Sequence, residues 1–188
     1  AALRIDQRSG AGSDQPCVAG EHWDWDGVTF ELLAGPAEDL SDNDGSCVLR
    51  VSFAGQAVLL TGDIEAKGEA RLLATVPDRL KAEVLITPHH GSRTSSSAAF
   101  IAAVSPALTI HSAGWHHRFG HPSREVVARY TVRAVEQIAT GDSGAVSVDF
   151  DMNGRRTDME RRRAKRLWST PADFVWHNDI PTRSEAAR

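Results

Sequence analysis

A mixed α/β layered domain is the fold class that this sequence predicts, on two observations. The first part of the chain contains two β-hairpin patterns, over residues 23–33 and 47–60, with turns at residues 26–27 and 54–56. The second part alternates apolar strand patterns with amphipathic helix patterns, beginning with a strand–helix–strand unit over residues 58–87. Hairpins followed by alternating β and α elements are typical of a sheet on which helices pack.

Each later element follows from its local pattern. Leu72, Leu73 and Val76 have the spacing of a helix over residues 64–76, which joins the strands at 57–60 and 82–87. The serines that end the hydroxyl-rich loop at 92–97 can cap the next helix, and Pro122 suits the first turn of a later one. The remaining expected elements are a helix over 98–104, a strand over 107–112, a helix over 123–135 and a strand over 144–150.

Length and composition limit the domain organisation. The 188 residues, with 41% hydrophobic and 24% charged side chains, suit one globular domain. We expect a loop over residues 1–16, the domain over 17–150 and a basic tail over 151–188, which holds nine Lys/Arg against six Asp/Glu. The basic cluster from Arg155 to Arg166 has two interpretations, a solvated tail helix or a contact with DNA phosphates.

Two cysteines, Cys17 and Cys47, allow a single disulfide or none, and the sequence alone does not choose. Both flank predicted strands. We therefore expect them to form a disulfide that joins the early hairpins, if the domain lies outside the reducing cytosol.

Two predicted strands lead to residues of the types that commonly bind metals. The apolar run at 58–60 leads to Asp63, and the run at 82–87 leads to His89 and His90. The ends of neighbouring strands meet at one edge of an α/β sheet, and carboxylate oxygen with imidazole nitrogen suits a divalent cation such as zinc or manganese. Neighbouring side chains at a strand end point to opposite faces, so one histidine is expected to face the site. Asp63 alone would also suit a turn or a helix cap.

A third polar cluster, over residues 112–122, ends in His121-Pro122. An exposed loop explains His116 and His117. His121 lies at the expected start of a helix, where backbone N–H groups favour an anion. It is therefore a candidate for phosphate contact or proton transfer.

Taken together, these motifs resemble the C-terminal part of the ComEC family of DNA-internalisation competence proteins. The resemblance rests on several spaced motifs in the expected order and covers about residues 17–150. The motifs are residues 61–65, 85–96, 112–114 and 118–122, together with Cys17, Gly20, Trp23, Gly27 and residues 46–49.

The resemblance implies the C-terminal portion of a metallo-β-lactamase-like αββα sandwich with one or two metal ions at an edge. Asp63 would bridge the metals, His89 or His90 would be a ligand, and His121 would be the late active-site histidine. Ser92 and Arg93 would contact nucleic acid. The family implies a channel in the cytoplasmic membrane, with this domain on the extracytoplasmic (periplasmic) side. Its partners would be DNA, the channel portion of the same protein and other competence proteins, with no nucleotide cofactor.

One departure from the family pattern is large. Metallo-β-lactamase folds carry a His-x-Asp/His-x-Asp-His motif, which does not occur in this sequence. A partial match begins at His22, but Gly27 occupies the position of the last histidine. We therefore expect the chain to begin after that motif and to be inactive alone, although the complete domain would hydrolyse DNA phosphodiesters. The alternatives are a non-catalytic DNA-guiding or structural module, and another phosphodiesterase of the same fold.

Overall fold

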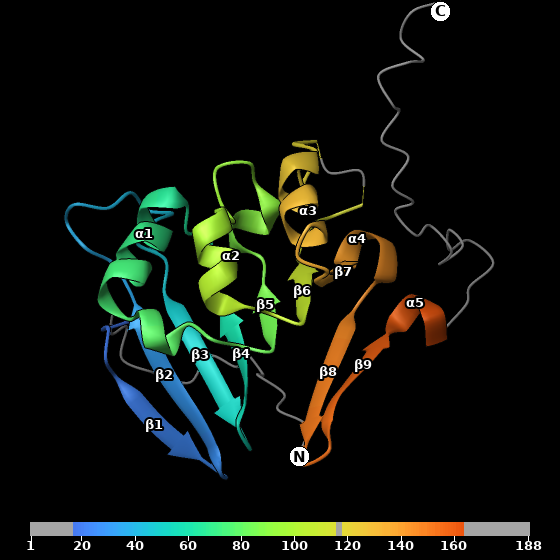
Figure 1. Cartoon of the computed structure of the whole chain (residues 1–188), viewed down its shortest axis with the longest axis horizontal. Helices are drawn as coiled ribbons and strands as arrows, with labels where there is room; N and C mark the ends of the chain where they lie inside the picture. Colours follow the sequence, from blue (N-terminus) through green and yellow to red (C-terminus); the bar gives the residue numbers. More distant parts are fainter. Residues whose placement is uncertain (1–16, 116–117, 164–188) are drawn as a thin grey trace, which may run out of the picture.

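A seven-stranded sheet forms the centre of the computed structural model, which describes residues 17–115 and 118–163 (Figure 1). The first four strands are antiparallel and the last four are parallel, so β4 belongs to both parts. The strands lie in chain order: β1 (His22–Trp25), β2 (Val28–Ala34), β3 (Val48–Phe53), β4 (Gln56–Leu60), β5 (Val84–Ile86), β6 (Leu108–His111) and β7 (Glu136–Ala139).

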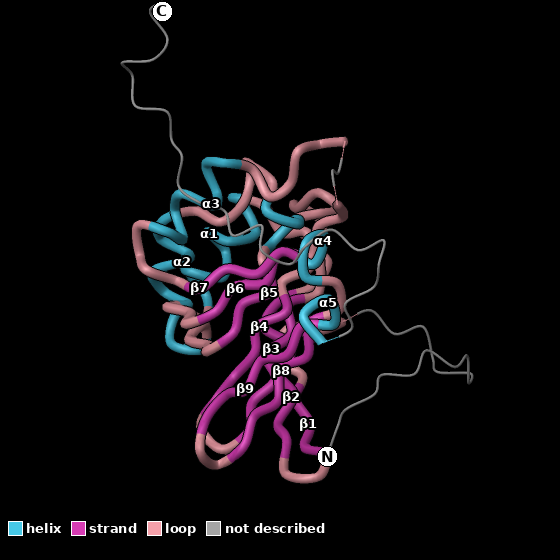
Figure 2. Tube along the Cα trace, turned by 90° about the vertical axis from the view of Figure 1, so that its right-hand side faces the viewer, coloured by secondary structure: helices cyan, strands magenta, loops and turns pink. Residues whose placement is uncertain are grey.

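Three helices cover one face of this sheet: α1 (Ala66–Thr75), α2 (Ala98–Val104) and α3 (Arg124–Thr131) (Figure 2). They lie in the connections between the parallel strands, which require crossovers of this kind. Leu59 and Leu85 of the sheet pack with Leu72, Phe100 and Tyr130 of the helices in one fully buried core. The 3₁₀ turns η1 (Pro77–Arg79) and η2 (Pro88–Gly91) flank β5.

A two-stranded ribbon, β8 (Val146–Asp151) and β9 (Gly154–Met159), packs against the other face. Leu85 points towards the helices, whereas its neighbours Val84 and Ile86 point to the opposite face and join a second core with Val148 and Phe150 of the ribbon. The short helices α4 (Thr140–Ser143) and α5 (Glu160–Arg163) connect to the ends of the ribbon strands. The result is an arrangement of helices, sheet and ribbon, which confirms the α/β class.

The same face of the sheet is apolar beyond the ribbon, on β1 to β3. Trp23 of β1 stacks on Phe30 of β2 with ring centroids 5.2 Å apart, and Phe30 pairs with Val51 of β3. Trp23 and Trp25 remain 45% and 61% exposed. This end of the sheet therefore presents large aromatic side chains to solvent.

None of the helices in the described part of the chain is long and apolar enough to span a membrane.

Several predicted elements are confirmed. Both hairpins form, with turns after Trp25 and Phe53. The helix over residues 98–104 has the predicted bounds, and Ser97 caps it by accepting a hydrogen bond from the N–H of Phe100 at 3.2 Å. The strand–helix–strand unit is also present, with a parallel pairing of β4 and β5.

The C-terminal part differs from the prediction. Pro122 lies before the helix rather than in its first turn, because Ser123 is the N-cap of α3. The helix ends at Thr131, and the chain then forms β7, which we did not predict.

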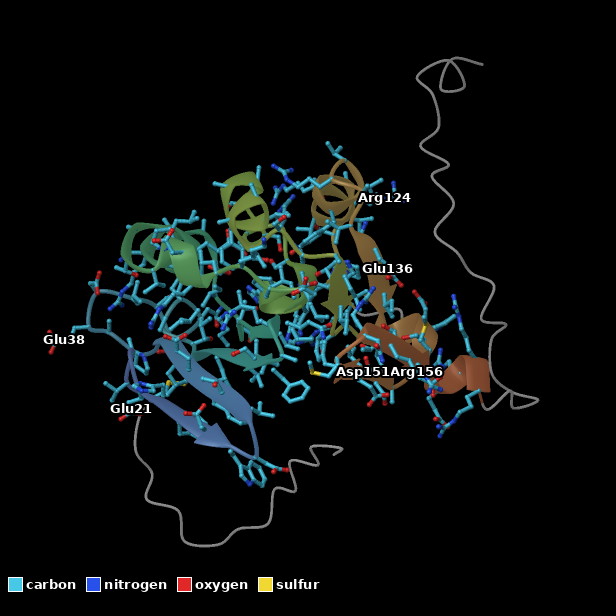
Figure 3. All side chains as sticks on the ribbon, turned by 60° about the horizontal axis from the view of Figure 1, so that its bottom comes forward. Glu21, Glu38, Arg124, Glu136, Asp151 and Arg156 are labelled. Carbon is cyan, nitrogen blue, oxygen red and sulfur yellow. A yellow bond between two sulfur atoms is a disulfide. The ribbon has the colours of Figure 1, made fainter. Side chains whose placement is uncertain are left out.

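The strand expected over residues 144–150 pairs with β9 outside the main sheet. Arg155 and Arg156 consequently lie in a strand and not in a tail helix. Glu136 of β7 lies near the ribbon (Figure 3), and Arg155 Nη2 donates to Glu136 Oε2 at 2.8 Å.

Cys17 and Cys47 form a disulfide with a Cα–Cα distance of 6.0 Å. The expected pairing is thereby confirmed. It joins the segment before β1 to the residue that precedes β3.

The disulfide should contribute measurably to stability. It closes a loop with a sequence separation of 30 residues, for which restriction of the unfolded chain is worth about 3–4 kcal/mol. Replacing both cysteines with serine should lower the free energy of unfolding in urea by about this amount. Thiol labelling of the oxidised, denatured protein should find neither cysteine reactive. Two reactive thiols would show that the bond does not form.

A buried imidazole lies between the helices and the parallel strands. His111 at the end of β6 bonds through Nδ1 to Thr87 Oγ1 at 2.9 Å and through Nε2 to Gln137 Oε1 at 3.0 Å. Burial lowers the pKa of His111 from 6.5 to about 4. Burial also raises the pKa of Glu69, whose carboxylate accepts the backbone N–H groups of Ser96 and Ser97.

His111 should make the protein less stable in acid. Between pH 6.5 and about 4 the imidazole of His111 becomes protonated in the unfolded chain but stays neutral in the folded protein. The free energy of unfolding therefore keeps its full value, as far as His111 determines it, above pH 6.5 and decreases as the pH falls to about 4. The loss should be about 3 kcal/mol. The raised pKa of Glu69 changes the free energy of unfolding with pH in the opposite direction. Urea unfolding must therefore be measured at each pH for both the wild type and His111→Gln, so that the contribution of His111 is isolated. Equal pH slopes for the two proteins would contradict this assignment.

Candidate functional site

Three loops meet at the carboxyl ends of the parallel strands, and they carry the candidate residues. Asp63 follows β4, His89 and His90 follow β5, and His121 lies in the connection after β6. Backbone hydrogen bonds join the loops: the N–H of His89 donates to Gly62 O at 3.1 Å, and the N–H of Ser123 donates to Gly91 O at 2.9 Å. The fold therefore brings together side chains that are far apart in the sequence.

Residues of the loop that precedes β3 hold the loop after β4 in place. Gly62 has φ +56°, and a Cβ there would lie 2.7 Å from Ser46 Cβ, so this position requires glycine. The N–H of Asp63 donates to Ser46 Oγ at 3.1 Å. Buried Asp44 accepts the N–H groups of Glu65 at 2.9 Å and Gly68 at 2.7 Å, which fixes the start of α1.

His89 and His90 lie in the η2 turn, with φ values of 47° and 55°. The expectation that they would alternate across a strand end is therefore wrong, because β5 ends at Ile86. A left-handed backbone costs roughly 1–2 kcal/mol at each non-glycine residue. The surrounding loops must hold this turn in place, and strained residues of this kind cluster at functional sites.

His90 faces Asp63 across a short, partly exposed gap. Its Nδ1 lies 2.8 Å from the carbonyl oxygen of Ser112, which can only accept, so Nδ1 carries a proton. Its Nε2 lies 3.5 Å from Asp63 Oδ1. In the neutral imidazole this nitrogen is an acceptor, and two acceptors would face each other. A cation or a water molecule between the two atoms would resolve the conflict.

His89 faces a second carboxylate. Its Nδ1 lies 2.9 Å from Glu65 Oε1, which also accepts the hydroxyl of Thr94 at 2.7 Å. The ring of His121 lies 6.1 Å from that of His89, measured between centroids. His121 precedes the N-cap Ser123 and is not in the first turn of α3, so the helix N-terminus does not explain its position as we had expected.

The two predicted nucleic-acid contacts have different surroundings. Ser92 is buried, and its hydroxyl lies 3.0 Å from that of Thr94, so Ser92 shapes the loop. Arg93 is exposed beside it and can reach solvent or a phosphate.

The candidate ligands among the described residues form pairs and not a larger cluster. Among residues 17–115 and 118–163, no group of three or more His, Cys, Asp or Glu side chains is arranged to hold a metal ion. The pairs Asp63–His90 and Glu65–His89 fit two ligands each. His22 lies on β1, which β2 and β3 separate from β4, so the partial motif that begins there is remote from these pairs.

Sequence reasoning missed three contributors to the site. Glu65 had a signal, because it follows Asp63 closely in the same motif. Asp44 acts on the start of α1 from another loop, and Ser112 acts through its backbone carbonyl, which any residue would provide.

Comparison with known proteins gives consistent relatives. The chain is 41% identical over 145 residues to competence protein ComA of Neisseria gonorrhoeae, covering 76% of this chain and 21% of that protein. It is 39% identical over 153 residues to recombination protein 2 of Haemophilus influenzae, covering 79% and 18%. It is 34% identical over 124 residues to ComE operon protein 3 of Bacillus subtilis, covering 65% and 16%. The chain thus spans only 16–21% of the length of these relatives. No family model matches it.

We expect the 188-residue chain alone to bind zinc or manganese weakly and to cleave DNA poorly. A catalytic zinc site normally has three protein ligands and an open position, and each pair here supplies two. Metal analysis after dialysis, with a DNA cleavage assay, measures both properties. Stoichiometric metal binding with cleavage that Asp63→Ala abolishes would contradict the expectation.

Proposed function

The chain is a homologue of the ComEC family of competence proteins, and from that premise we propose that it carries part of a metal-dependent hydrolase site in a DNA-uptake protein. The substrate would be a DNA phosphodiester. The metal would be zinc or manganese, as one or two ions in the complete protein.

The opposed acceptors of Asp63 and His90 are the observation that carries this proposal. A cation between Asp63 Oδ1 and His90 Nε2 would remove their conflict, and carboxylate with imidazole suits zinc and manganese. The Ser112 carbonyl holds the other nitrogen of His90, as is usual for metal-binding histidines. Further ligands would come from outside the described residues. When bound, the metal would supply Lewis-acid activation of a water molecule and of the phosphodiester.

The neighbouring residues have separate roles in the proposal. Of the two candidate histidine ligands, His90 is favoured, because its Nε2 faces Asp63 while the carbonyl of Ser112 orients its ring through Nδ1. His121, next to His89, would handle a phosphate oxygen or a proton. Exposed Arg93 would contact the DNA backbone.

We also propose that the domain works outside the cytoplasm, on the periplasmic side of the membrane, beside the channel portion of the same protein and other competence proteins. The Cys17–Cys47 disulfide supports this location, because such bonds persist in oxidising compartments.

A second candidate is a module that guides DNA without cleaving it. The observation in its favour is that, within the described ranges, no three-ligand metal cluster is found. In that case a water molecule between Asp63 and His90 would take the place of the metal and donate to both acceptors.

Variants of the complete uptake protein separate these candidates. Asp63→Asn removes the charge but keeps the shape of the side chain, and it should abolish metal-dependent cleavage while the fold survives. His90→Ala should remove both metal and cleavage. His89→Ala should cost about 10–100-fold if it acts by orienting the site. His121→Ala should lower turnover more than metal content.

Metal analysis beside the cleavage assay reads out each variant. The matched controls are His22→Ala on β1 and Asp149→Asn on β8, which are exposed and should behave as the wild type. Cleavage that survives Asp63→Asn would refute the hydrolase proposal and favour the guiding module. If His89→Ala empties the site and His90→Ala leaves it full, the ligand is His89.

A further inference from the structure

Beside the left-handed turn of His89 and His90 lies a buried imidazole that none of the proposed catalytic roles uses. It belongs to His111 at the end of β6, and only 2% of this residue is exposed. A Cβ added to Gly91, the last residue of the turn, would lie 3.4 Å from Nδ1 of His111. The ring therefore packs directly against the segment that presents both candidate ligands.

Gln137 of β7 determines the tautomer of His111. The side-chain nitrogen of Gln137 donates to Val127 O at 3.2 Å and to Thr131 Oγ1 at 3.0 Å, so its oxygen Oε1 faces the ring. Because this oxygen can only accept, Nε2 of His111, 3.0 Å away, carries a proton. Burial lowers the pKa of His111 to about 4, so the ring is neutral and Nδ1 keeps a lone pair.

Nδ1 of His111 accepts the hydroxyl proton of Thr87. The two atoms are 2.9 Å apart, and only the hydroxyl has a proton to donate. The hydroxyl oxygen of Thr87 lies 2.8 Å from that of Thr109, which can donate to it. Because all three side chains are buried, a lost partner is costly, and the bonds hold Thr87 in this geometry.

Thr87 is the residue from which the turn starts. It is the N-cap of η2, and its own N–H donates to Ile110 O at 3.0 Å. The side chain and the main chain of Thr87 are thus both tied to the end of β6. Since His89 and His90 have a strained backbone, their conformation depends on fixed flanking residues of this kind.

The backbone after His111 supports the same turn from another side. The carbonyl oxygen of Ser112 accepts the Nδ1 proton of His90 at 2.8 Å. Thr140 Oγ1 donates to His111 O at 3.3 Å and ties this backbone to the start of α4. His111 is therefore connected to the turn through Thr87 and through the segment that carries the acceptor of His90.

We propose that His111 is a positioning residue of the candidate site, which holds the left-handed turn through Thr87 and so keeps Nε2 of His90 directed at Asp63. The inference rests on the proposed function only in that His90 is taken as a ligand. The positioning is a property of the chain itself, so it can be measured without a metal.

Two substitutions separate the two hydrogen bonds of the His111 ring. An asparagine amide reaches the place of Nδ1, and a glutamine amide reaches the place of Nε2. His111→Asn therefore keeps an acceptor for Thr87, whereas His111→Gln keeps only the contact with Gln137. The smaller asparagine leaves the larger cavity, so a purely structural role would make His111→Asn the worse variant.

The test is NMR of the imidazole nitrogens in the 188-residue chain, in mildly alkaline buffer without metal, which reports the tautomer of His90. In the wild type and in His111→Asn the proton should stay on Nδ1 of His90. In His111→Gln this preference should be lost. The N–H of Ser92, which donates to His89 O at 2.8 Å, should then exchange with solvent about tenfold faster.

A second pair of variants tests the same contact from the other partner. Thr87→Val removes the hydroxyl and keeps the shape of the side chain, so it should behave like His111→Gln. Thr87→Ser keeps the hydroxyl and should behave like the wild type. The matched control is Ser97→Ala, which removes the N-cap of α2 and lowers stability, and which should leave the tautomer of His90 unchanged.

Urea unfolding gives the stability of each variant, so that a change in the turn is separated from a general loss of stability. The proposal is overturned if His111→Asn disturbs His90 as much as His111→Gln does. It is also overturned if Thr87→Val leaves the turn unchanged, or if the wild type shows no preference for the proton on Nδ1 of His90.

Failure of the positioning role and failure of the hydrolase are distinguishable. In the complete uptake protein, Thr87→Val should lower cleavage by about 10–100-fold, and Thr87→Ser much less. A disturbed His90 tautomer with unchanged cleavage would leave the positioning role and remove His90 from the hydrolase site. Cleavage that depends on Asp63 and His90, with an undisturbed tautomer in Thr87→Val, would remove the positioning role alone.

Discussion

The hydrogen bond from the N–H of His89 to the carbonyl oxygen of Gly62 is the constraint on which the site depends. It joins the loops after two neighbouring parallel strands, at 3.1 Å, while His89 and His90 are held in a left-handed turn. With the Ser123–Gly91 bond, it brings the third loop to the same edge. Without these links the two histidines would lose the geometry that directs them to Glu65 and Asp63.

Both faces of the sheet support this edge. Helices α1 to α3 pack on one face of the strands, and the β8–β9 ribbon packs on the other, so β5 and β6 are covered on both faces. Buried carboxylates then fix the loops, with Asp44 at the start of α1 and Glu69 on the backbone of Ser96 and Ser97. The rigid framework explains how exposed side chains keep defined positions.

The sequence predicted the site to the extent that it follows from strand ends. Apolar runs that lead to Asp63 and to His89-His90 require these residues to meet, because parallel strands end at one edge. The left-handed turn was not predictable, since no periodicity marks a positive φ at histidine. Strand β7 was missed because it has only four residues and begins with the polar Glu136 and Gln137, so it lacks an apolar strand pattern. The ribbon was missed because its second strand lies beyond residue 150, where we expected the domain to end. Ser112 acts through its backbone, which leaves no trace in side-chain chemistry.

A metal ion between Asp63 and His90 is the central claim, and anomalous diffraction from crystals of the complete uptake protein with zinc or manganese tests it most directly. We expect an anomalous peak that both Asp63 Oδ1 and His90 Nε2 coordinate, at about 2.0–2.2 Å for zinc, with further ligands from outside the described part of this chain. A metal bound elsewhere, with Asp63 and His90 still facing each other across an unoccupied gap, would contradict the claim.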